Sequence, residues 1–329
     1  MPGSQLKVAF WNVQNLFEPN VVSRGPQSVS ELDEKIDRLA AVIKRFFGNA
    51  GPDLLSLGEV GSQRIHQEVA KKVFGGGNFL EAWAPPGLST GSNAQTGIGL
   101  LGRSSRVAQL NIVDTQRPTT AARPRCMIVE CDLVGIHERV LLVTNHWKSR
   151  LPSSPITDGD DRLQTADWLG QRLASEQRTT SVIALGDFNA EPFEPPFGEL
   201  RLRAQRNFSG ALWSSATPAY LYNTAWRFMS EPDLWEVASQ QGYEEPRPKS
   251  SHGDSGVNLL DHILVSGRVL KNGPLRLQES SVEFHVETGV NARHTRTGVL
   301  RPEKWKEAAP GDFHGCSDHL PILARFDVV

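Results

Sequence analysis

The sequence predicts an α/β fold, and two observations support this class. Short apolar runs, typical of buried strands, alternate along the chain with segments whose apolar residues recur at helical spacing. The 329 residues are 39% hydrophobic and 22% charged, which supplies a large core and excludes an intrinsically disordered chain. By length alone, the chain has room for two domains or for one large one.

Strands are expected where the apolar runs occur, because these runs are too short for buried helices. The predicted strands cover 7–13, 53–57, 97–101, 126–133, 140–144, 181–185, 259–265 and 322–328. Three helices follow from apolar residues three and four positions apart, at about 30–47, 62–74 and 161–175. Ser28 and Glu31 have the spacing of a capping box before the first helix, and Gly48 is a stop signal after it.

Two segments break the pattern, at about 201–258 and 289–315. The first is rich in aromatic residues, which either pack in the core and loops or form a substrate-facing insertion with stacking rings. The second carries Arg293, Lys304 and Trp305, and is either a solvated loop or a phosphate-contacting one in which the Trp305 ring stacks on a base.

Charge and composition exclude several classes of protein. The formal net charge is −2, so binding of a polyanion must rest on a local basic patch. No apolar run has the length of a membrane span, and residues 1–7 lack the pattern of a secretory signal. The three cysteines form no disulfide framework. We therefore expect a cytoplasmic protein with no membrane association and no obligate protein partner.

Polar residues interrupt the apolar runs, most of them at a strand end. They are Asn12, Glu59, Asn145, His146, Asp187, Asn189, Asp261, Asp318 and His319. Asp261 lies within the predicted strand 259–265, and Asp318 and His319 come just before the last strand. Any one of them alone is explained by a helix cap or a turn. Together they indicate a site, because α/β folds assemble sites from distant segments at strand ends.

The residue types at these strand ends point to a metal-assisted reaction. Carboxylate and amide oxygens suit Mg²⁺ or Mn²⁺, whereas zinc prefers histidine and cysteine. Two histidines add groups that exchange protons near neutral pH. Such a set fits hydrolysis of a phosphate ester, in which a metal neutralises oxyanion charge and a base activates water.

The same residues lie in motifs that resemble the endonuclease/exonuclease/phosphatase superfamily, the DNase I-like fold. The motifs begin at Phe10-Trp11-Asn12, Leu57-Gly58-Glu59, Thr144-Asn145-His146, Gly186-Asp187-Phe188-Asn189, Leu260-Asp261-His262 and Ser317-Asp318-His319. They occur in the family's order across nearly the whole chain. The resemblance implies one domain over 6–329 and a four-layer α-β-β-α sandwich, with two packed, mainly antiparallel mixed sheets flanked by helices.

The resemblance also implies a metal site. Glu59 corresponds to the principal Mg²⁺ ligand, with Mn²⁺ able to substitute. Asn12 lies beside it in the family pattern, and Asp318 contributes directly or through water.

Catalytic roles are carried over in the same way. His319 is set against the attacked phosphate and Asp261 orients it. Asp187 positions or deprotonates the water, and Asn189 donates to the phosphate oxygen or the nucleophile. His146 occupies the place of a second histidine in the DNase I and sphingomyelinase branches, where it protonates the leaving oxygen or stabilises the pentavalent state. The resemblance leaves open which group is the base.

Three basic residues are further candidates for phosphate binding. Lys148 follows the motif that contains His146, and Arg125 precedes the predicted strand 126–133. Arg162 begins the third predicted helix, where it either holds a loop or reaches the cleft. A solvated surface position is the alternative for Lys148 and Arg125.

The motifs differ from two branches of the superfamily. Inositol-polyphosphate 5-phosphatases carry Pro-x-Trp-x-Asp-Arg where this chain has Leu259-Leu260-Asp261-His262, and apurinic-site endonucleases lack a histidine at the position of His146. Bacterial nuclease-like members are the most similar. We therefore expect a metal-dependent phosphodiesterase that acts on nucleic acid, with DNA favoured, as an endonuclease or exonuclease. The alternatives are a phosphoesterase on a lipid headgroup or inositol phosphate, and a non-catalytic binding module.

Overall fold

The computed structural model describes most of the chain. The described residues exclude 1–3, 87–95, 118–122, 150–159, 199–200, 214–218, 230–238, 241–248, 254–255, 297 and 306–314. Within the described part, no helix combines the length and apolar character that crossing a bilayer requires.

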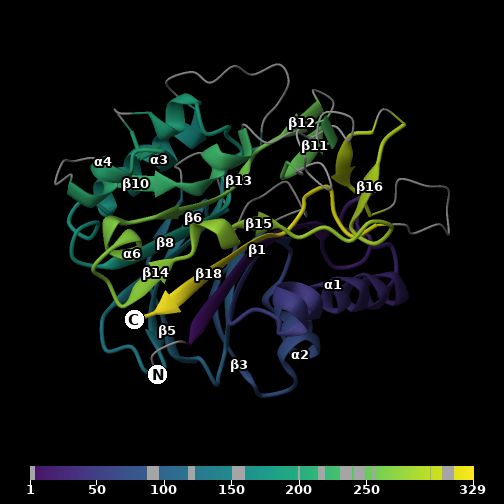
Figure 1. The fold of residues 1–329 in the computed structure, drawn as a ribbon. Helices are drawn as coiled ribbons and strands as arrows, with labels where there is room; N and C mark the ends of the chain where they lie inside the picture. The colour runs from purple at the N-terminus through teal and green to yellow at the C-terminus, as the bar shows by residue number, and fades with distance from the viewer. Residues whose placement is uncertain are drawn as a thin grey trace.

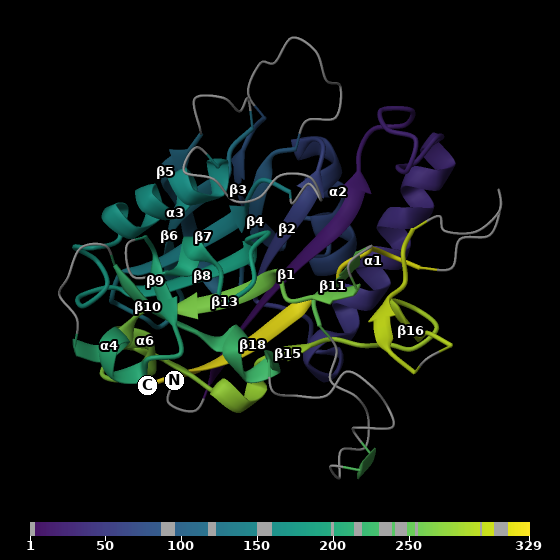
Figure 2. The ribbon, with the colours of Figure 1, turned by 90° about the horizontal axis from the view of Figure 1, so that it is seen from above.

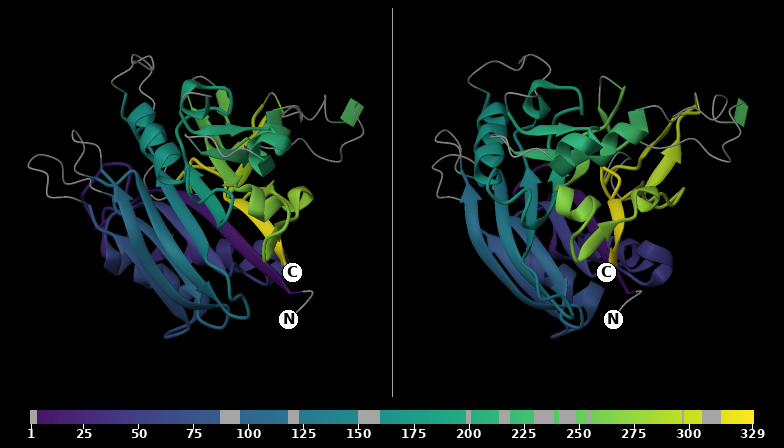
Figure 3. Two further views of the ribbon diagram at one scale, coloured as in Figure 1. Left: turned by 90° about the vertical axis from the view of Figure 1, so that its left-hand side faces the viewer. Right: turned by 60° about the vertical axis from the view of Figure 1, so that its left-hand side comes forward.

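Two seven-stranded sheets lie face to face (Figures 1 and 3). The first has the order β14-β18-β1-β2-β4-β3, and β15 also pairs with β18. Its strands are β1 (Gln5–Leu16), β2 (Leu54–Val60), β3 (Phe79–Ala84), β4 (Ile98–Arg103), β14 (Leu275–Leu277), β15 (Glu283–Phe284) and β18 (Ile322–Val328). Most pairs are antiparallel, whereas β1 and β2 are parallel.

The second sheet has the order β5-β6-β7-β8-β13-β10-β9. Its strands are β5 (Val107–Gln116), β6 (Cys126–Leu133), β7 (Val140–His146), β8 (Ser181–Asp187), β9 (Arg203–Gln205), β10 (Tyr220–Asn223) and β13 (Asp261–Val265). Two pairs in it are parallel, β7 with β8 and β9 with β10. Two hairpins lie apart from both sheets: β11 (Ser251–Gly253) with β12 (Gly256–Asn258), and β16 (Ala292–His294) with β17 (Leu300–Pro302).

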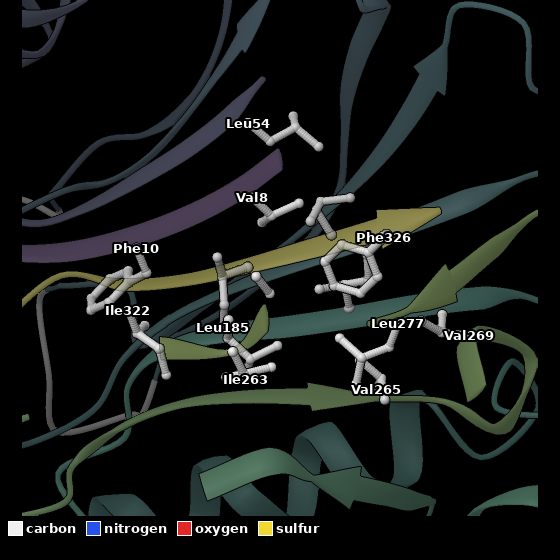
Figure 4. Close-up of a cluster of buried hydrophobic side chains, with 14 of the residues drawn as sticks. Val8, Phe10, Leu54, Leu185, Ile263, Val265, Val269, Leu277, Ile322 and Phe326 are labelled. Carbon is white, nitrogen blue, oxygen red and sulfur yellow. The ribbon is translucent and has the colours of Figure 1, made fainter. Parts of the chain in front are cut away.

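Apolar side chains fill the space between the two sheets. Figure 4 shows Val8 and Phe10 of β1 and Phe326 of β18 gathered with Leu185 of β8 and Ile263 of β13. Alternate residues of the same strands point away from this core, because successive side chains of a strand face opposite sides of the sheet. They form two outer cores that the helices cover.

The outer cores complete a four-layer sandwich. Helices α1 (Val29–Asn49) and α2 (Gln63–Phe74) pack on the first sheet, where Trp11 is among the buried side chains. Helix α3 (Asp161–Arg172) packs on the second sheet, against residues such as Val143 and Phe188. The predicted fold class is confirmed: two mixed sheets flanked by helices form the α-β-β-α arrangement (Figure 1).

Local signals explain the start and end of α1. The Ser28 side chain accepts a hydrogen bond from the Glu31 backbone N–H at 3.1 Å, as the capping box predicts. The Glu31 carboxylate differs from the standard box, because it accepts from the Gln27 N–H at 2.7 Å. The backbone leaves helical geometry at Phe46–Gly48, where Gly48 adopts a positive φ of 69°, so the predicted stop lies where the helix breaks.

Several strands were not predicted, and each lacks a clear apolar run. β5 carries exposed residues, including Ile112 at 43%, along much of its length. The segment 201–258, expected to be irregular, contributes β9 and β10 to the edge of the second sheet. These strands have three and four residues, too few for a period to be recognised. Further short elements are η1 (Pro195–Phe197), α4 (Phe208–Trp213), η2 (Thr224–Met229), α6 (Gly267–Leu270) and η3 (Glu279–Ser281).

Candidate active site

The sheet topology places the predicted polar residues at one end of the sandwich. On the second sheet, His146 of β7 is paired in register with Asp187 of β8, and Asp187 with Asp261 of β13. β1 and β18 of the first sheet contact β8 and β13 across the core (Figure 2). Asn12 of β1 and His319, just before β18, therefore face the same end from the opposite sheet.

Strand alternation aims most of these side chains inward. Leu185 and Ile263 belong to the central core, so Asp187 and Asp261, two residues away on each strand, point to the same face. Glu59 is different, because alternation would place it with the outward-facing Leu57. Glu59 adopts a positive φ of 61°, and the pairing of β1 with β2 is irregular beyond Asn12, so the local backbone departs from regular strand geometry. Such strained residues are typical of functional sites.

Asn12 joins the two sheets at this point. Its Nδ2 donates to Glu59 Oε1 at 3.3 Å and to Asp187 Oδ2 at 3.1 Å. Its Oδ1 accepts from the Gln14 backbone N–H at 3.1 Å, which fixes the amide. Asn12 thus lies beside Glu59, as the family pattern implies, and positions two carboxylates. Its direct ligation of a metal stays a prediction.

His319 and Asp261 form a buried pair. His319 Nδ1 and Asp261 Oδ2 are 2.7 Å apart, and His319 Nε2 lies 3.9 Å from Asp187 Oδ2. Burial disfavours the charged imidazole, but the carboxylates of Asp261, Asp187 and Asp318 outweigh it and raise the pKa of His319 well above its usual value. The Trp11 indole N–H donates to the His319 carbonyl at 2.8 Å and fixes this residue from the first sheet. The arrangement is that of a proton-exchanging histidine and its orienting carboxylate.

The Asp187 carboxylate lies close to both Asn12 and His319. It is 1% exposed, and burial raises its pKa to about 7, with His319 opposing the shift and Asp261 adding to it. Its Oδ1 accepts from the Asn189 N–H at 2.9 Å, so the turn after β8 is closed by the carboxylate itself. The preceding Gly186 is required by space, because a Cβ there would lie 2.1 Å from the Asn145 carbonyl oxygen.

Asn189 is held through both its side chain and its backbone. Its Nδ2 donates to the Trp147 carbonyl at 3.2 Å, and its own carbonyl accepts from Arg162 Nη1 at 3.0 Å. Like Glu59, it has a positive φ, here 48°. The structure therefore brings Asn189 to the site on a tightly constrained turn. Its donation to a phosphate oxygen stays a prediction.

Glu59 and Asp318 supply the oxygens of a candidate cation site. Burial raises the pKa of Glu59, and the nearby Asp318 carboxylate raises it further. One Asp318 oxygen, Oδ1, is buried without a hydrogen-bond partner among the described residues. An unpartnered buried carboxylate oxygen beside a second carboxylate fits a hard divalent cation such as Mg²⁺ or Mn²⁺. The predicted metal residues thus fit the ion, and the identity of the metal stays a prediction.

A second group of side chains has metal-compatible spacing. Ligand atoms of Asp187, Asp261 and His319 all lie within 4.8 Å of one another. In this group His319 Nδ1 contacts Asp261 Oδ2 directly, while Asp261 Oδ1 has no hydrogen-bond partner among the described residues. That the Glu59–Asp318 pair holds the cation, and this group exchanges protons, stays a prediction.

His146 lies beside two arginines. Burial lowers its pKa to about 3, and the positive charges of Arg123, Arg125 and His319 add to the effect. A neutral imidazole of this kind acts as a hydrogen-bond donor more readily than as a proton source. Of the two alternatives for His146, stabilisation of the charged intermediate therefore agrees better with its surroundings.

The three basic candidates lie in different environments. Arg125 is 4% exposed and contacts Asp161 at 3.4 Å, and burial lowers its pKa to about 10, so it stays charged at neutral pH. Lys148 is partly buried. Arg162 donates from Nε and Nη2 to Asp160 at 3.0 Å each, besides its bond to Asn189. These contacts match the loop-holding alternative for Arg162. Phosphate binding by the three residues stays a prediction.

The expectation that Trp305 could stack on a base is wrong. Its ring is 1% exposed, and Lys35 Nζ lies 5.2 Å from the ring centroid. The Trp305 backbone N–H donates to Gln14 Oε1 at 3.0 Å, which ties this segment to β1. Lys306, from the same basic stretch, lies outside the described residues.

Several supporting hydrogen bonds come from residues with no predicted role. The Ser317 hydroxyl donates to the Asn12 carbonyl at 2.5 Å, and Asn145 Oδ1 accepts from the Trp147 indole at 3.0 Å. Both belong to motifs quoted above, where their neighbours received the roles. Ser250 Oγ accepts from the backbone N–H groups of Leu260 and Asp261 at 2.6 and 3.1 Å. Nothing in the sequence around Ser250 distinguishes it from an ordinary loop serine.

Known structures share this fold over nearly their whole length. TDP2 from D. rerio, complexed with a single-strand DNA product, is 15% identical with a TM-score of 0.56, covering 98% of this chain and 99% of that one. A mannosyl-6-phosphatase from Bacteroides thetaiotaomicron is 12% identical with a TM-score of 0.58, covering 98% and 99%. Among proteins of curated function, none matches the sequence.

The sequence profile of the Endonuclease/Exonuclease/phosphatase family matches residues 9–319. This match spans all the strand-end residues that meet at the junction of the two sheets, from Asn12 to His319. The chain therefore belongs to the Endonuclease/Exonuclease/phosphatase family, whose members hydrolyse phosphoester bonds.

Proposed function

We propose that the protein is a Mg²⁺-dependent phosphodiesterase that hydrolyses nucleic acid, with DNA as the favoured polymer. The observation that carries the proposal is the contact between two halves of one site. Asn12 of the first sheet bonds Asp187 of the second at 3.1 Å, and His319 lies between Asp187 and Asp261. These contacts support our proposal that a cation site at Glu59 and Asp318 adjoins a proton-exchanging pair, His319 and Asp261.

The residues divide the work of hydrolysis between them. Asp187 holds the attacking water, since it is buried, has a pKa raised to about 7 and lies 3.9 Å from His319. His319, oriented by Asp261, faces the phosphate as a charged donor. Asn189 and the neutral His146 donate hydrogen bonds to its oxygens. Glu59 and Asp318 would hold Mg²⁺, with Asn12 orienting Glu59; the bound ion would supply charge neutralisation at a phosphoryl oxygen.

Basic residues on one side of the site support a polyanionic substrate. The positive charges of Arg123 and Arg125 both lower the pKa of His146, and that of Lys148 lowers the pKa of Asp160. A local cluster of this kind is what a chain with a net charge of −2 needs for binding a polyphosphate. The structural likeness to TDP2 bound to single-strand DNA agrees with this substrate class.

A small phosphoester is the second candidate, and one observation favours it. The mannosyl-6-phosphatase has a TM-score as high as that of TDP2, and the near-zero net charge suits a compact substrate as well as a polymer. This candidate includes a sugar phosphate, a lipid headgroup and an inositol phosphate.

The test is an activity panel with Mg²⁺ present. The substrates are supercoiled plasmid, end-labelled single and double strands, RNA, a phosphodiester dye and a sugar phosphate monoester, and Asp187→Ala is the control. We expect polymer cleavage that falls steeply with salt, because phosphate contacts release counterions. Turnover of the monoester with little salt dependence, and no polymer cleavage, would overturn the proposal in favour of the second candidate.

A further inference from the structure

A pocket of about 360 Å³ opens beside the active site rather than over its carboxylates. It lies where β9 and β10 end, between the turn that follows Asn189 and the helix η2. Its lining includes Phe193, Glu194, Phe197, Gln205, Arg206 and Trp226. The proposed catalytic roles leave this pocket unused.

The buried wall of the pocket is shared with the catalytic strand ends. Phe197 lines the pocket and lies 5.9 Å from Trp147, 5.5 Å from Phe188 and 4.9 Å from His262, measured between ring centroids. Each of these three residues directly follows a proposed catalytic residue in the chain. The pocket is therefore fixed relative to the active site by one aromatic cluster.

The strand order gives the scale of the separation. β13 and β10 lie between β8 and β9, and neighbouring strands are about 4.8 Å apart. The register sets Asn223, the last residue of β10, level with Ala184, and Gln205, the last residue of β9, level with Ile183. Allowing about 3.3 Å per residue along the strands, these two ends lie about 14 Å and about 20 Å from Asp187. A polymer whose phosphate is at Asp187 can reach this pocket, whereas the reacting group of a small phosphoester cannot.

The chemistry of the lining suits a neutral, planar, heteroaromatic ring. Phe193 is 62% exposed at the rim, and the Trp226 indole forms another part of the wall. Exposed aromatic faces in a nucleic-acid site stack on bases. Gln205 and Asn207 add carboxamides, which pair with base edges because each carries a donor and an acceptor. Glu194 and Arg206 add one carboxylate and one guanidinium, so the formal charges of the lining cancel, as suits a neutral ring.

We propose that this pocket is a nucleobase subsite, in which Phe193 stacks on a base of the strand whose backbone is cleaved at Asp187. The inference rests on the proposed function, because it needs a polymeric substrate. Binding a base at this distance strengthens the ground state and the transition state alike. It therefore lowers KM for a polymer and leaves the chemical step unaltered.

The experiment is an abasic scan of a single-stranded oligonucleotide. One base at a time is replaced by an abasic analogue on either side of the cleaved bond, and KM and kcat are measured for the parent, Phe193→Ala and Ile112→Ala. Ile112 is the matched control, since it is an exposed apolar residue on β5, at the opposite edge of the second sheet. A phosphodiester dye is the substrate that is too small to span both sites.

We expect one abasic position to raise KM about 5- to 100-fold in the parent, as loss of a stacked base does. Phe193→Ala raises KM for the natural strand by a similar factor. For the strand that lacks the base at that position, Phe193→Ala raises KM little further. The fall in kcat/KM caused by Phe193→Ala is at least about fivefold larger on the oligonucleotide than on the dye. Ile112→Ala behaves as the parent does. The subsite is overturned if every abasic position changes KM equally, or if Phe193→Ala and Ile112→Ala give the same KM.

Two readouts separate this inference from the proposed function. Cleavage of the natural oligonucleotide by the parent tests the function. Affinity of the catalytically impaired Asp187→Ala protein for natural and abasic strands tests the subsite, even where cleavage fails. Cleavage that does not depend on any base contradicts the subsite and agrees with the proposed nuclease function. Equal affinity for both strands, with turnover of the dye alone, removes both.

Discussion

Arg162 is the residue for which structure and sequence offer competing roles, and its replacement by methionine distinguishes them. The guanidinium is 3% exposed, donates twice to Asp160 at 3.0 Å and donates to the Asn189 carbonyl at 3.0 Å. Methionine fills similar space without charge. Arg162→Met therefore leaves the buried Asp160 carboxylate without its partner and releases the turn that carries Asn189.

The size of the effect follows from this burial. Removing one partner of a buried ion pair costs about 3–5 kcal/mol, a large part of the roughly 5–15 kcal/mol by which domains are stable. We expect the urea midpoint of unfolding to fall with an unchanged m value. Because Asn189 loses a fixed position, kcat falls about tenfold or more on any accepted substrate.

A second variant isolates the ion pair from the helix cap. Asp160 Oδ1 also accepts from the Arg162 backbone N–H at 2.8 Å, as the N-cap of α3. Asp160→Asn keeps an oxygen for that bond while removing the charge. The double variant Asp160→Asn/Arg162→Met should therefore recover at least about 1 kcal/mol of the stability that Arg162→Met loses.

The loop-holding role would be refuted by the opposite pattern. If Arg162 contacts substrate phosphate, Arg162→Met stays within about 1 kcal/mol of the parent in stability. Its affinity for a labelled oligonucleotide then falls, and the slope of log affinity against log salt decreases by about 1.

Three further predictions follow from the same geometry. Glu59→Gln should weaken divalent-metal binding, measured by calorimetry, and remove most turnover with the circular dichroism spectrum unchanged; activity that survives rigorous chelation would contradict the metal role. His319→Ala and His146→Ala should each lower kcat at least about 10²-fold, and near-parental kcat at saturating substrate and metal would remove that residue from the chemical step. Burial lowers the pKa of His262 from 6.5 to about 4, so its stabilising contribution is complete above pH 6.5 and is lost as the pH falls to about 4. The contribution lost from the free energy of unfolding is about 3 kcal/mol. Urea unfolding should show that the free energy of unfolding falls between pH 7 and pH 4 by more in the parent than in His262→Phe. Parallel pH profiles of the two proteins would exclude this contribution of His262.

Much of the site follows from the sequence because its residues break an otherwise apolar pattern. Asp187 comes directly after a buried run, and Asp261 stands at the start of another. Antiparallel pairing of those two strands then places both carboxylates in one register pair. The bounds of β6 and β18 agree with the predicted strands for the same reason, since a continuous apolar run leaves little choice of register.

Other features depend on contacts that no local pattern contains. The bond of Arg162 to the carbonyl of Asn189, 27 positions away, is one such contact. Trp305 was expected at the surface because basic residues surround it, yet its ring is buried beneath Lys35. The pocket of Phe193 forms because β9 and β10, each too short to show a period, extend the second sheet beside the catalytic strands.

In the proposed reaction, water held by Asp187 attacks a phosphodiester at the junction of the two sheets. The most direct measurement is cleavage of a single-stranded oligonucleotide in ¹⁸O-labelled water across a Mg²⁺ titration, with the parent and Asp187→Asn, and mass analysis of the products. We expect one ¹⁸O atom on the phosphate of each cleaved bond, a rate that saturates with Mg²⁺, and loss of cleavage in Asp187→Asn. Products without ¹⁸O on phosphorus, or an Asp187→Asn protein that cleaves like the parent, would contradict it.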